Sequence, residues 1–467
     1  MKKSLLFASM FALAMSANAE TDGCTYDVVD GTVLTSKWIA SNTVDARTWT
    51  QDYTDLSMAK GARTATIGKV GDKEKILITQ TGPATEELEA PGYMYIMDFF
   101  TGKLEKKLQL SCDGEPLNGT LCVNQVGCDD FGHVWVCGYK GTSYVVNAED
   151  PSKSYSNPIV VYQVTDFETG ACTKTFEVIL PEDEKDAAGR LDYYDIIGDI
   201  TRQEAACVIM SPVASGSNLF VYGWRAEQGG EFGPLMSDGE YVSGIMEESY
   251  PAEQTSWGTA PTVSIIKDED FTGEMFYVDG FTTCPSLYNT SGSMLSSFAT
   301  VDKSLTPALG TNGVCEFNMN GWPYLFYSIS QYDKDPGCQT NVVKLGEGSN
   351  FDEMQLMWTF PTVGLGTLSD GGTRYHACNA RVYADENGVE GAYLLTYKCC
   401  NGVGVYTVAP ENWIDPYANA VNDIVADDVN APVEYFNLNG VAVDADNLTP
   451  GLYITRQGSK ANKVVVK

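Results

Sequence analysis

An internal repeat is the feature that most constrains the fold of this chain. Residues 93 to 110 (YMYIMDFFTGKLEKKLQL) align with residues 160 to 178 (VVYQVTDFETGACTKTFEV) through a shared D-F-x-T-G segment, at an offset of 68 residues. Each copy reads as a strand, a Thr-Gly turn and a second strand, because β-branched and aromatic residues flank a turn dipeptide. Self-similarity at a fixed offset is typical of a chain built from one repeated supersecondary unit.

Two further strand-like runs precede each copy, at residues 64 to 70 with 75 to 80 and at residues 123 to 128 with 133 to 139. Each unit therefore contains four strands. Small four-stranded sheets that bury their faces against their neighbours around an axis form a β-propeller. A large β-sandwich also has short strands at regular spacing, and it remains the alternative.

Two short segments resemble those of propeller blades. The D-x-x-T-G turn resembles the turn before the outermost strand of many blades, and residues 128 to 136 (CDDFGHVWV) resemble their D-x-x-G-x-(V/L)-W-V hairpin. Residues 268 to 278 (DEDFTGEMFYV) read as a third copy that lacks one residue of the turn. We expect an all-β protein with a propeller over residues 20 to 408, of about seven four-stranded blades at about 40 to 50 residues each.

Further strands are predicted by short apolar runs between turn residues. The dipeptides Asn320-Gly321 and Asn387-Gly388 separate such runs and favour tight hairpins. Trp135, Trp224 and Trp358 are expected to fill the wedges between blades. The predicted strands cover residues 75–79, 93–97, 134–137, 159–164, 219–224, 324–329, 393–397 and 404–408.

The N-terminal residues predict export from a Gram-negative cell. Residues 1 to 19 combine two lysines, an apolar stretch and an A-x-A pattern, as in a signal peptide removed before Glu20. No other stretch approaches the roughly 18 to 20 apolar residues of a membrane helix, so no transmembrane segment is expected. The predicted location is the periplasm, the outer surface or the extracellular space.

The C-terminal residues form a separate small module. Residues 409 to 431 read as a linker, and residues 432 to 467 as short strands with a Leu-Asn-Gly turn. This tail resembles the C-terminal sorting modules of the type IX secretion system. Asn437 to Gly440, Leu448 to Tyr453 and Lys463 to Lys467 carry the match, which implies sorting to the cell surface. The tail is shorter than the family's module and lacks clear upstream strands.

The charge excludes one class of partner. With 62 acidic and 30 basic residues the net charge is −32, and such a chain repels nucleic acid. Solubility accounts for the acidity, and calcium binding is the alternative. Asp268 and Asp270 are candidate calcium ligands, although their spacing is not that of an EF-hand loop. No other cofactor is indicated.

Catalytic candidates are few, because the chain has only two histidines. His133 follows a turn and reads as a residue bonded to backbone. His376 follows a glycine pair and has Arg374 and Tyr375 beside it, so this triplet is the candidate catalytic group. No nucleophile elbow, zinc-protease motif or Walker loop occurs in the sequence.

Aromatic residues suggest a binding surface. Trp257 and Trp322 each lie beside a glycine in a predicted loop, where an exposed indole would offer a platform for a sugar. The first functional hypothesis is therefore a non-enzymatic secreted or cell-surface protein that binds a glycan or a protein. The alternatives are a polysaccharide hydrolase or lyase with a cross-blade site that includes His376, and a structural surface protein.

Overall fold

The computed structural model divides the chain into two compact units, residues 1–413 and 414–467. No helix among the described residues is long and apolar enough to cross a bilayer. The structure describes residues 22–43, 47–53, 62–81, 91–117, 125–138, 144–145, 155–156, 159–178, 191–201, 206–212, 219–223, 233–234, 236–237, 240–241, 245–246, 258–267, 273–289, 293–306, 309–331, 335–368, 375–418, 433–437, 442–445, 448–457 and 460–466. The predicted signal peptide lies outside these ranges.

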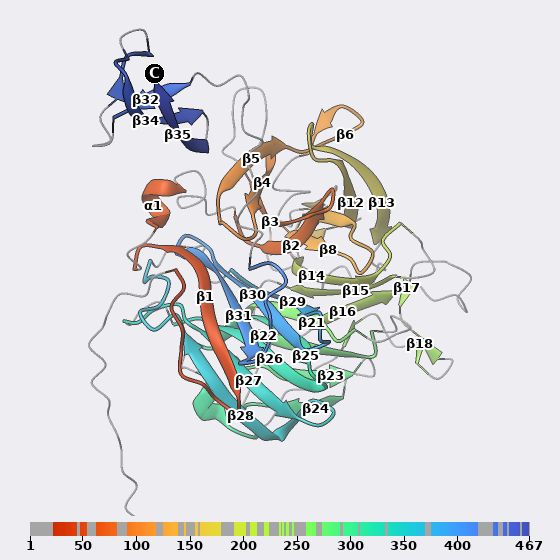
Figure 1. Ribbon diagram of the computed structural model, residues 1–467. Helices are drawn as coiled ribbons and strands as arrows, with labels where there is room; N and C mark the ends of the chain where they lie inside the picture. Colours follow the sequence, from red (N-terminus) through yellow and green to blue (C-terminus); the bar gives the residue numbers. More distant parts are fainter. Residues whose placement is uncertain are drawn as a thin grey trace, which may run out of the picture. The chain divides into compact units, whose positions relative to one another are not determined.

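The described strands of the first unit form six sheets of at least four strands, each beginning at an inner strand and ending at an outer one (Figure 1). Blade 1 consists of β2 (Ala65–Val70), β3 (Lys73–Thr81), β4 (Gly92–Asp98) and β5 (Leu104–Gln109), and blade 2 of β8 (Gln125–Cys128), β9 (Val134–Cys137), β12 (Ile159–Asp166) and β13 (Ala171–Val178). Blade 3 consists of β14 (Leu191–Gly198), β15 (Ala206–Pro212), β16 (Leu219–Gly223) and β17 (Gly233–Pro234), and blade 4 of β21 (Thr259–Ile265), β22 (Met275–Phe281), β23 (Ser286–Asn289) and β24 (Met294–Ser297). Blade 5 consists of β25 (Thr311–Met319), β26 (Trp322–Ile329), β27 (Thr340–Gly346) and β28 (Asn350–Phe360), and blade 6 of β29 (His376–Ala384), β30 (Glu390–Lys398), β31 (Gly402–Pro410) and β1 (Thr32–Ser41).

Short accessory elements complete the unit. β6 and β7 extend blade 2, β20 pairs with β16, and two small hairpins stand apart from the blades. Their bounds, with those of the two short helices, are β6 (Ser111–Cys112), β7 (Glu115–Pro116), β10 (Tyr144–Val145), β11 (Tyr155–Ser156), β18 (Met236–Ser237), β19 (Glu240–Tyr241), β20 (Ile245–Met246), α1 (Trp49–Asp52) and η4 (Lys303–Leu305).

The inner strands close a ring. β2 contacts β8, β8 contacts β14, and the series continues through β21, β25 and β29 back to β2. A ring of four-stranded sheets is a β-propeller, which confirms the predicted fold class. The described residues form six blades where about seven were expected, because the 68-residue repeat is longer than the assumed 40 to 50 residues per blade.

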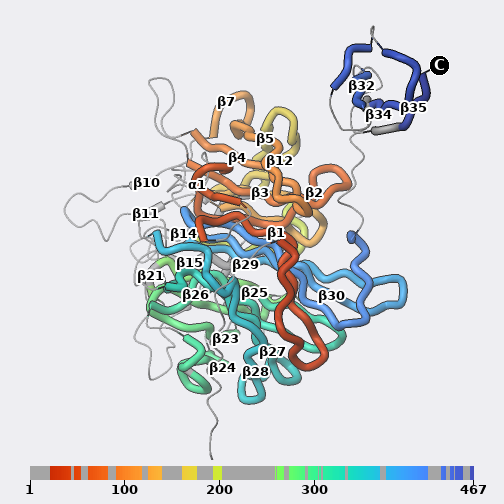
Figure 2. Tube along the Cα trace, turned by 60° about the vertical axis from the view of Figure 1, so that its left-hand side comes forward, coloured from red at the N-terminus to blue at the C-terminus, as the bar shows by residue number. Residues whose placement is uncertain are grey.

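The last blade is completed by the N-terminal strand. β1 pairs antiparallel with β31, so that the beginning and the end of the unit lie in one sheet. In Figure 2 the red trace of β1 runs alongside strands of the blue end of the unit. The sequence analysis did not identify β1, whose pairing partner lies more than 350 residues away in the chain.

Both complete copies of the repeat form the predicted turn between the third and fourth strands of a blade. In the first copy the Asp98 carboxylate accepts hydrogen bonds from the Thr101 amide (2.9 Å) and hydroxyl (2.7 Å), and Gly102 adopts φ +67°. In the second copy Asp166 accepts from Thr169 in the same way, and Gly170 has φ +81°. Glycine is needed at this position because other residues rarely adopt a left-handed conformation.

The prediction for the third copy of the sequence repeat is wrong. β22 follows its turn segment, and β22 is the second strand of blade 4, not the fourth. Residues 275–278 therefore occupy another position in the blade than the second strand of the two complete copies, and residues 268–272 lie outside the described ranges. By contrast, Asn320 and Gly321 have φ +51° and +80° and join β25 to β26 as predicted.

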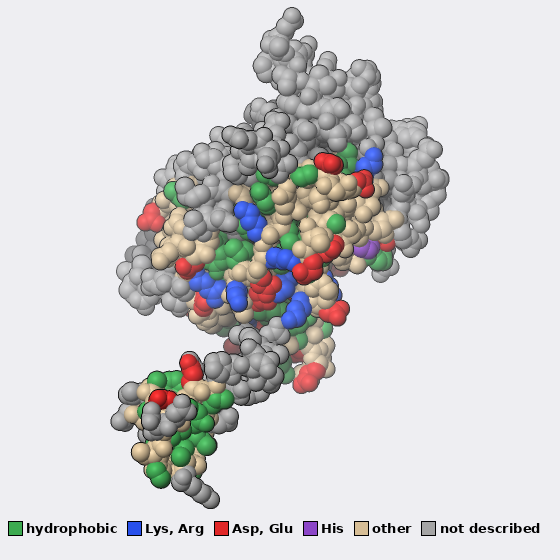
Figure 3. Space-filling model, turned by 90° about the horizontal axis from the view of Figure 1, so that it is seen from above, with side chains coloured by type: hydrophobic (Ala, Val, Ile, Leu, Met, Phe, Trp, Pro, Cys, Tyr) green, Lys and Arg blue, Asp and Glu red, His purple; other side chains and the backbone are tan. Residues whose placement is uncertain are grey.

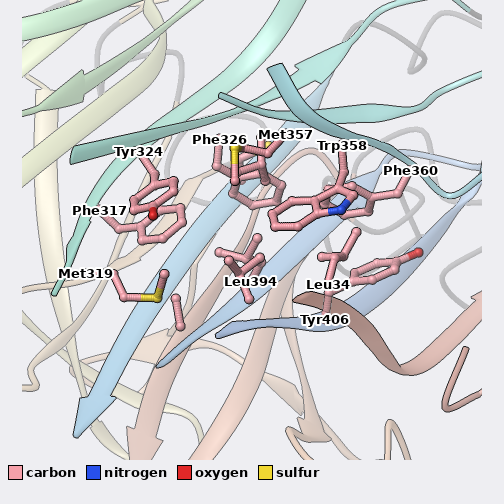
Figure 4. Close-up of a cluster of buried hydrophobic side chains, with 14 of the residues drawn as sticks. Leu34, Phe317, Met319, Tyr324, Phe326, Met357, Trp358, Phe360, Leu394 and Tyr406 are labelled. Atoms are coloured by element: carbon pink, nitrogen blue, oxygen red, sulfur yellow. The ribbon is translucent and has the colours of Figure 1, made fainter. Parts of the chain in front are cut away.

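Aromatic side chains fill the wedges between blades. Trp358 is 6% exposed, and its cluster joins blades 5 and 6, as Figure 4 shows. Trp135 is 2% exposed, so both tryptophans lie in the core as predicted. The side chain of Trp224 lies outside the described residues. Each large apolar side chain buried in this way contributes about 1.5 to 3 kcal/mol of stability.

The second unit is a single antiparallel sheet in the order β33-β32-β34-β35. Its strands are β32 (Glu434–Phe436), β33 (Ala442–Val443), β34 (Gly451–Gln457) and β35 (Lys460–Val466). The Pro450-Gly451 break lies at the start of β34. Most of the predicted linker, residues 419 to 431, lies outside the described ranges.

Candidate binding site in the central channel

The ring of inner strands encloses a cavity of about 310 Å³ along the axis of the propeller. All six inner strands contribute to its wall, so the site exists only when the ring is closed. Its lining mixes backbone with polar side chains from different blades, among them Thr66, Asp195, Lys267, Glu316, Asn318, His376, Asn379 and Arg381. A concave site with a few convergent polar groups is typical of ligand binding.

Side-chain hydrogen bonds tie the last inner strand to the first. Thr66 Oγ1 on β2 donates to Asn379 Oδ1 on β29 over 2.9 Å, and Arg381 Nη2 donates to the Ile67 carbonyl, also over 2.9 Å. These bonds hold Asn379 and Arg381 in place at the channel wall. Both residues are half-buried, so each also presents part of its polar surface to the cavity.

The ends of the inner strands form the open mouth of the channel. Lys267, just after β21, is 51% exposed and pairs with Asp130 of the β8–β9 turn over 2.7 Å. Arg381 makes no ion pair with any carboxylate among the residues that the structure describes. On the molecular face shown in Figure 3, basic and acidic side chains lie interspersed. Both Nη atoms of Arg381 donate to backbone carbonyls, of Ala380 (3.2 Å) and of Ile67.

The channel wall also contains a half-buried acid. Asp195 on β14 accepts hydrogen bonds from the amides of Ile265 (2.6 Å) and Ile196 (3.0 Å). Burial raises the pKa of Asp195 to about 6, although the Ile265 amide and the Lys267 charge oppose this shift. A carboxyl group in this range changes its charge in mildly acidic solution.

Trp135 reaches the same cavity from β9. Its ring lies directly over Gly127, where a Cβ atom would come within 2.1 Å of the indole. The indole Nε1 is buried and has no hydrogen-bond partner among the described residues. An unmade bond of a buried donor costs about 1 to 3 kcal/mol, so this N–H favours an acceptor in the cavity, from water or ligand.

His376 is the first residue of β29, not part of a projecting loop, and it lines the channel. It is 1% exposed, and its Nδ1 atom lies 2.7 Å from Ser328 Oγ of blade 5. Lys398 Nζ of β30 donates to the same hydroxyl and, over 2.9 Å, to the Gln339 carbonyl. Burial lowers the pKa of Lys398 to about 8, although nearby Asp279 opposes this shift.

Tyr375, which precedes His376, is also buried, with 6% of its surface exposed. Its ring centroid lies 6.1 Å from that of Tyr193, and the guanidinium of Arg63 lies 4.2 Å from it. Tyr375 and His376 are neighbours in sequence, and His376 lines the channel whereas Tyr375 does not. The third member of the predicted group, Arg374, lies outside the described residues.

A second, shallow groove of about 390 Å³ adjoins the mouth on blade 5. Trp322 lines it and is 45% exposed, with Lys344 Nζ 4.6 Å from its ring centroid. Glu316 and Asn318 line both this groove and the channel. A continuous surface therefore runs from the channel mouth to the Trp322 indole.

Three other predicted residues, Trp257, Asp268 and Asp270, lie outside the described residues. The sequence analysis missed Glu316, Asn318 and Arg381. Their signal in the sequence is weak, because they occupy ordinary positions of inner strands and only the ring brings them to one place.

No family model matches the sequence. No curated protein matches it in sequence either. Solved structures that resemble the fold are the Hadza microbial sialidase Hz136 (10% identity, 77% of this chain and 67% of that one, TM-score 0.39), the Dos1 propeller (10%, 74% and 68%, 0.33) and the alpha-L-arabinofuranosidase from Lactobacillus brevis (10%, 82% and 93%, 0.31). At these values the likenesses carry no information about ligand or chemistry, and the propeller assignment rests on the closed ring of sheets.

Proposed function

We propose that the first unit is a non-enzymatic binding propeller that takes a glycan at the mouth of its central channel and along the groove of blade 5. This proposal rests on the observation that Glu316 and Asn318 line both the channel and the groove. It makes one elongated site in which an aromatic platform adjoins a polar opening. A sugar chain needs this combination, because its rings have apolar faces and polar edges.

The polar groups of the mouth suit an acidic sugar. Arg381 offers a planar guanidinium that pairs with no described carboxylate. A guanidinium binds a carboxylate through two parallel hydrogen bonds, which gives affinity and orientation together. We therefore assign Arg381 to a uronate or similar carboxylate of the glycan, and Trp322 to stacking on a neighbouring ring.

The second candidate function is a polysaccharide hydrolase or lyase. The grouping of His376 and Lys398 around Ser328 favours a lyase, because proton abstraction needs a base and a lysine of lowered pKa or a histidine can serve as one. Ser328 and Lys398 have no exposed surface, however, and His376 is 1% exposed. A sugar bound at the mouth would not reach them, so this function ranks second.

Export and surface sorting belong to the same proposal. Residues 1 to 19 support removal of a signal peptide, and the four-stranded second unit contains the residues that resemble a type IX sorting module. We expect the mature chain to begin at Glu20, which N-terminal sequencing of the exported protein would check. Deletion of residues 432 to 467 should retain the protein inside the outer membrane of its native host.

The experiment for binding is a panel of neutral and uronate-containing polysaccharides. The full chain is run in affinity gels that contain each polysaccharide, and the same mixtures are assayed for new reducing ends and for new double bonds. Retardation without new ends supports the binding propeller. New ends or double bonds would establish an enzyme instead, and neither signal on any polysaccharide would contradict both functions and leave a protein partner or a structural role.

A further inference from the structure

Asp129, His133 and Asp199 form a compact cluster between blades 2 and 3, at the rim of the channel mouth. One donor atom from each lies within 4.8 Å of the other two. His133 Nδ1 is 2.9 Å from Asp129 Oδ2 and 3.3 Å from Asp199 Oδ1. The first two residues belong to the β8–β9 turn and the third follows β14, so the cluster depends on the packing of two blades.

The two carboxylates are held in place by backbone and hydroxyl donors. Asp129 Oδ1 accepts from the amides of Phe131 and His133, and Asp129 Oδ2 accepts from the Ile200 amide over 2.9 Å. Asp199 Oδ1 accepts from the amide and hydroxyl of Thr201. Outer hydrogen bonds of this kind orient the carboxylates that ligate metals.

The charges in the cluster are not balanced by the protein. The side chain of Asp129 has no exposed surface and that of Asp199 is 8% exposed. Among the described residues, His133 is the one side chain able to carry positive charge that contacts either of them. The nearby Lys267 is paired with Asp130. Two buried carboxylates against one imidazole leave a net negative site, which a divalent cation would neutralise.

We propose that Asp129, His133 and Asp199 bind a divalent transition metal of the zinc class. One imidazole and two carboxylates suit such an ion better than calcium, which takes oxygen ligands. Ligands about 2.1 Å from one ion lie roughly 3.0 to 3.4 Å apart at angles between 90° and tetrahedral, close to the spacing of His133 Nδ1 from the two oxygens. His133 is 29% exposed, so solvent or a ligand would occupy the remaining coordination position.

The test is titration of the full chain, freed of metal with a chelator, with Zn²⁺ in a calorimeter and with Co²⁺ by absorption. We expect one saturable site and a rise in Tm on binding. Cobalt should give weak d–d bands without an intense thiolate charge-transfer band. This spectrum distinguishes binding at the proposed site from binding to any of the thirteen cysteines. Calcium should not compete.

Matched variants locate the ion. His133→Asn keeps a donor to Asp129 but removes the imidazole, and Asp199→Asn keeps an acceptor for Thr201; each should weaken Zn²⁺ affinity at least about tenfold. Asp130→Asn removes the same charge from the same turn outside the cluster and should leave the affinity within about threefold. Absence of saturable binding to the unmodified chain would overturn the proposal, as would equal affinity in the His133→Asn variant.

Discussion

Leu34 lies opposite Val408 in the pairing of β1 with β31, and both side chains are fully buried. This pair joins the two ends of the first unit within one blade. The ring of inner strands, and with it the channel, is therefore stabilised by a strand that pairs with a partner far away in the sequence.

Truncation of the closing strand should destabilise the whole unit. Leu34→Ala removes a side chain from the core of blades 5 and 6 and should lower the free energy of unfolding by about 2 to 5 kcal/mol. Urea denaturation followed by tryptophan fluorescence measures this. Thr35→Ala, at the half-exposed next position, should cost less than about 1 kcal/mol. Equal small losses in the two variants would show that β1 is not needed for closure.

Lys398 should make the free energy of unfolding depend on pH in the alkaline range. Its pKa is lowered by burial to about 8 in the folded chain against 10.5 when exposed, so the unfolded chain holds more protons between these values. The free energy of unfolding therefore rises by up to about 3 kcal/mol between pH 8 and 10.5 as Lys398 loses its proton. Below pH 8 the folded chain bears the full cost of burying the charged lysine.

Lys398→Met removes this titration. The Lys398 charge also acts on Cys338 and Cys378, but burial raises the pKa of Cys338 to about 11 and that of Cys378 well above its ordinary value, so both thiols stay protonated up to pH 10. We expect the variant to be more stable relative to the unmodified chain at pH 7 than at pH 10, as measured by urea midpoints across this range. A difference between the two proteins that stays constant with pH would mean that the pKa of Lys398 is not lowered in the folded chain.

Trp322 should contribute to glycan affinity without contributing to folding. Trp322→Ala should weaken retention by the best polysaccharide at least about fivefold, because a lost aromatic platform costs more than about 1 kcal/mol. Its Tm should change little, since the side chain is 45% exposed. Leu295→Ala, at an exposed apolar side chain (48%) on the outer strand β24, is the control and should bind normally. Equal affinity of both variants would remove Trp322 from the site.

Arg381 should select acidic over neutral glycans. Arg381→Gln should weaken binding of a uronate-containing polysaccharide about tenfold or more, because a charged hydrogen-bonded pair is lost. Binding of a neutral polysaccharide should change by less than about threefold. Lys69→Gln removes the same charge from an exposed position on β2 and should have a small effect on both. A parallel loss on neutral and acidic ligands would assign Arg381 to the structure of the channel.

Local features of the fold could be predicted because their causes are local. The Asp98 and Asp166 turns depend on one carboxylate that caps an amide three residues later, and Asn320-Gly321 on two residues that tolerate positive φ. The repeat of such turns indicated four-stranded units and hence a propeller. The exposure of Trp322 followed from its place beside the same Asn-Gly turn, and its role in binding stays a prediction.

The closure of the ring and the composition of the site were decided only by the tertiary structure. β1 completes a blade whose other strands lie at the far end of the unit, and Thr66 meets Asn379 across 313 residues. Glu316, Asn318 and Arg381 occupy ordinary strand positions, and they converge because inner strands of different blades face one axis. The sequence by itself determined the Asp-Thr-Gly and Asn-Gly turns and many of the strands, although not β1, since these features depend on neighbouring residues. It did not determine which strands meet, because burial and pairing across the ring depend on the whole chain at once.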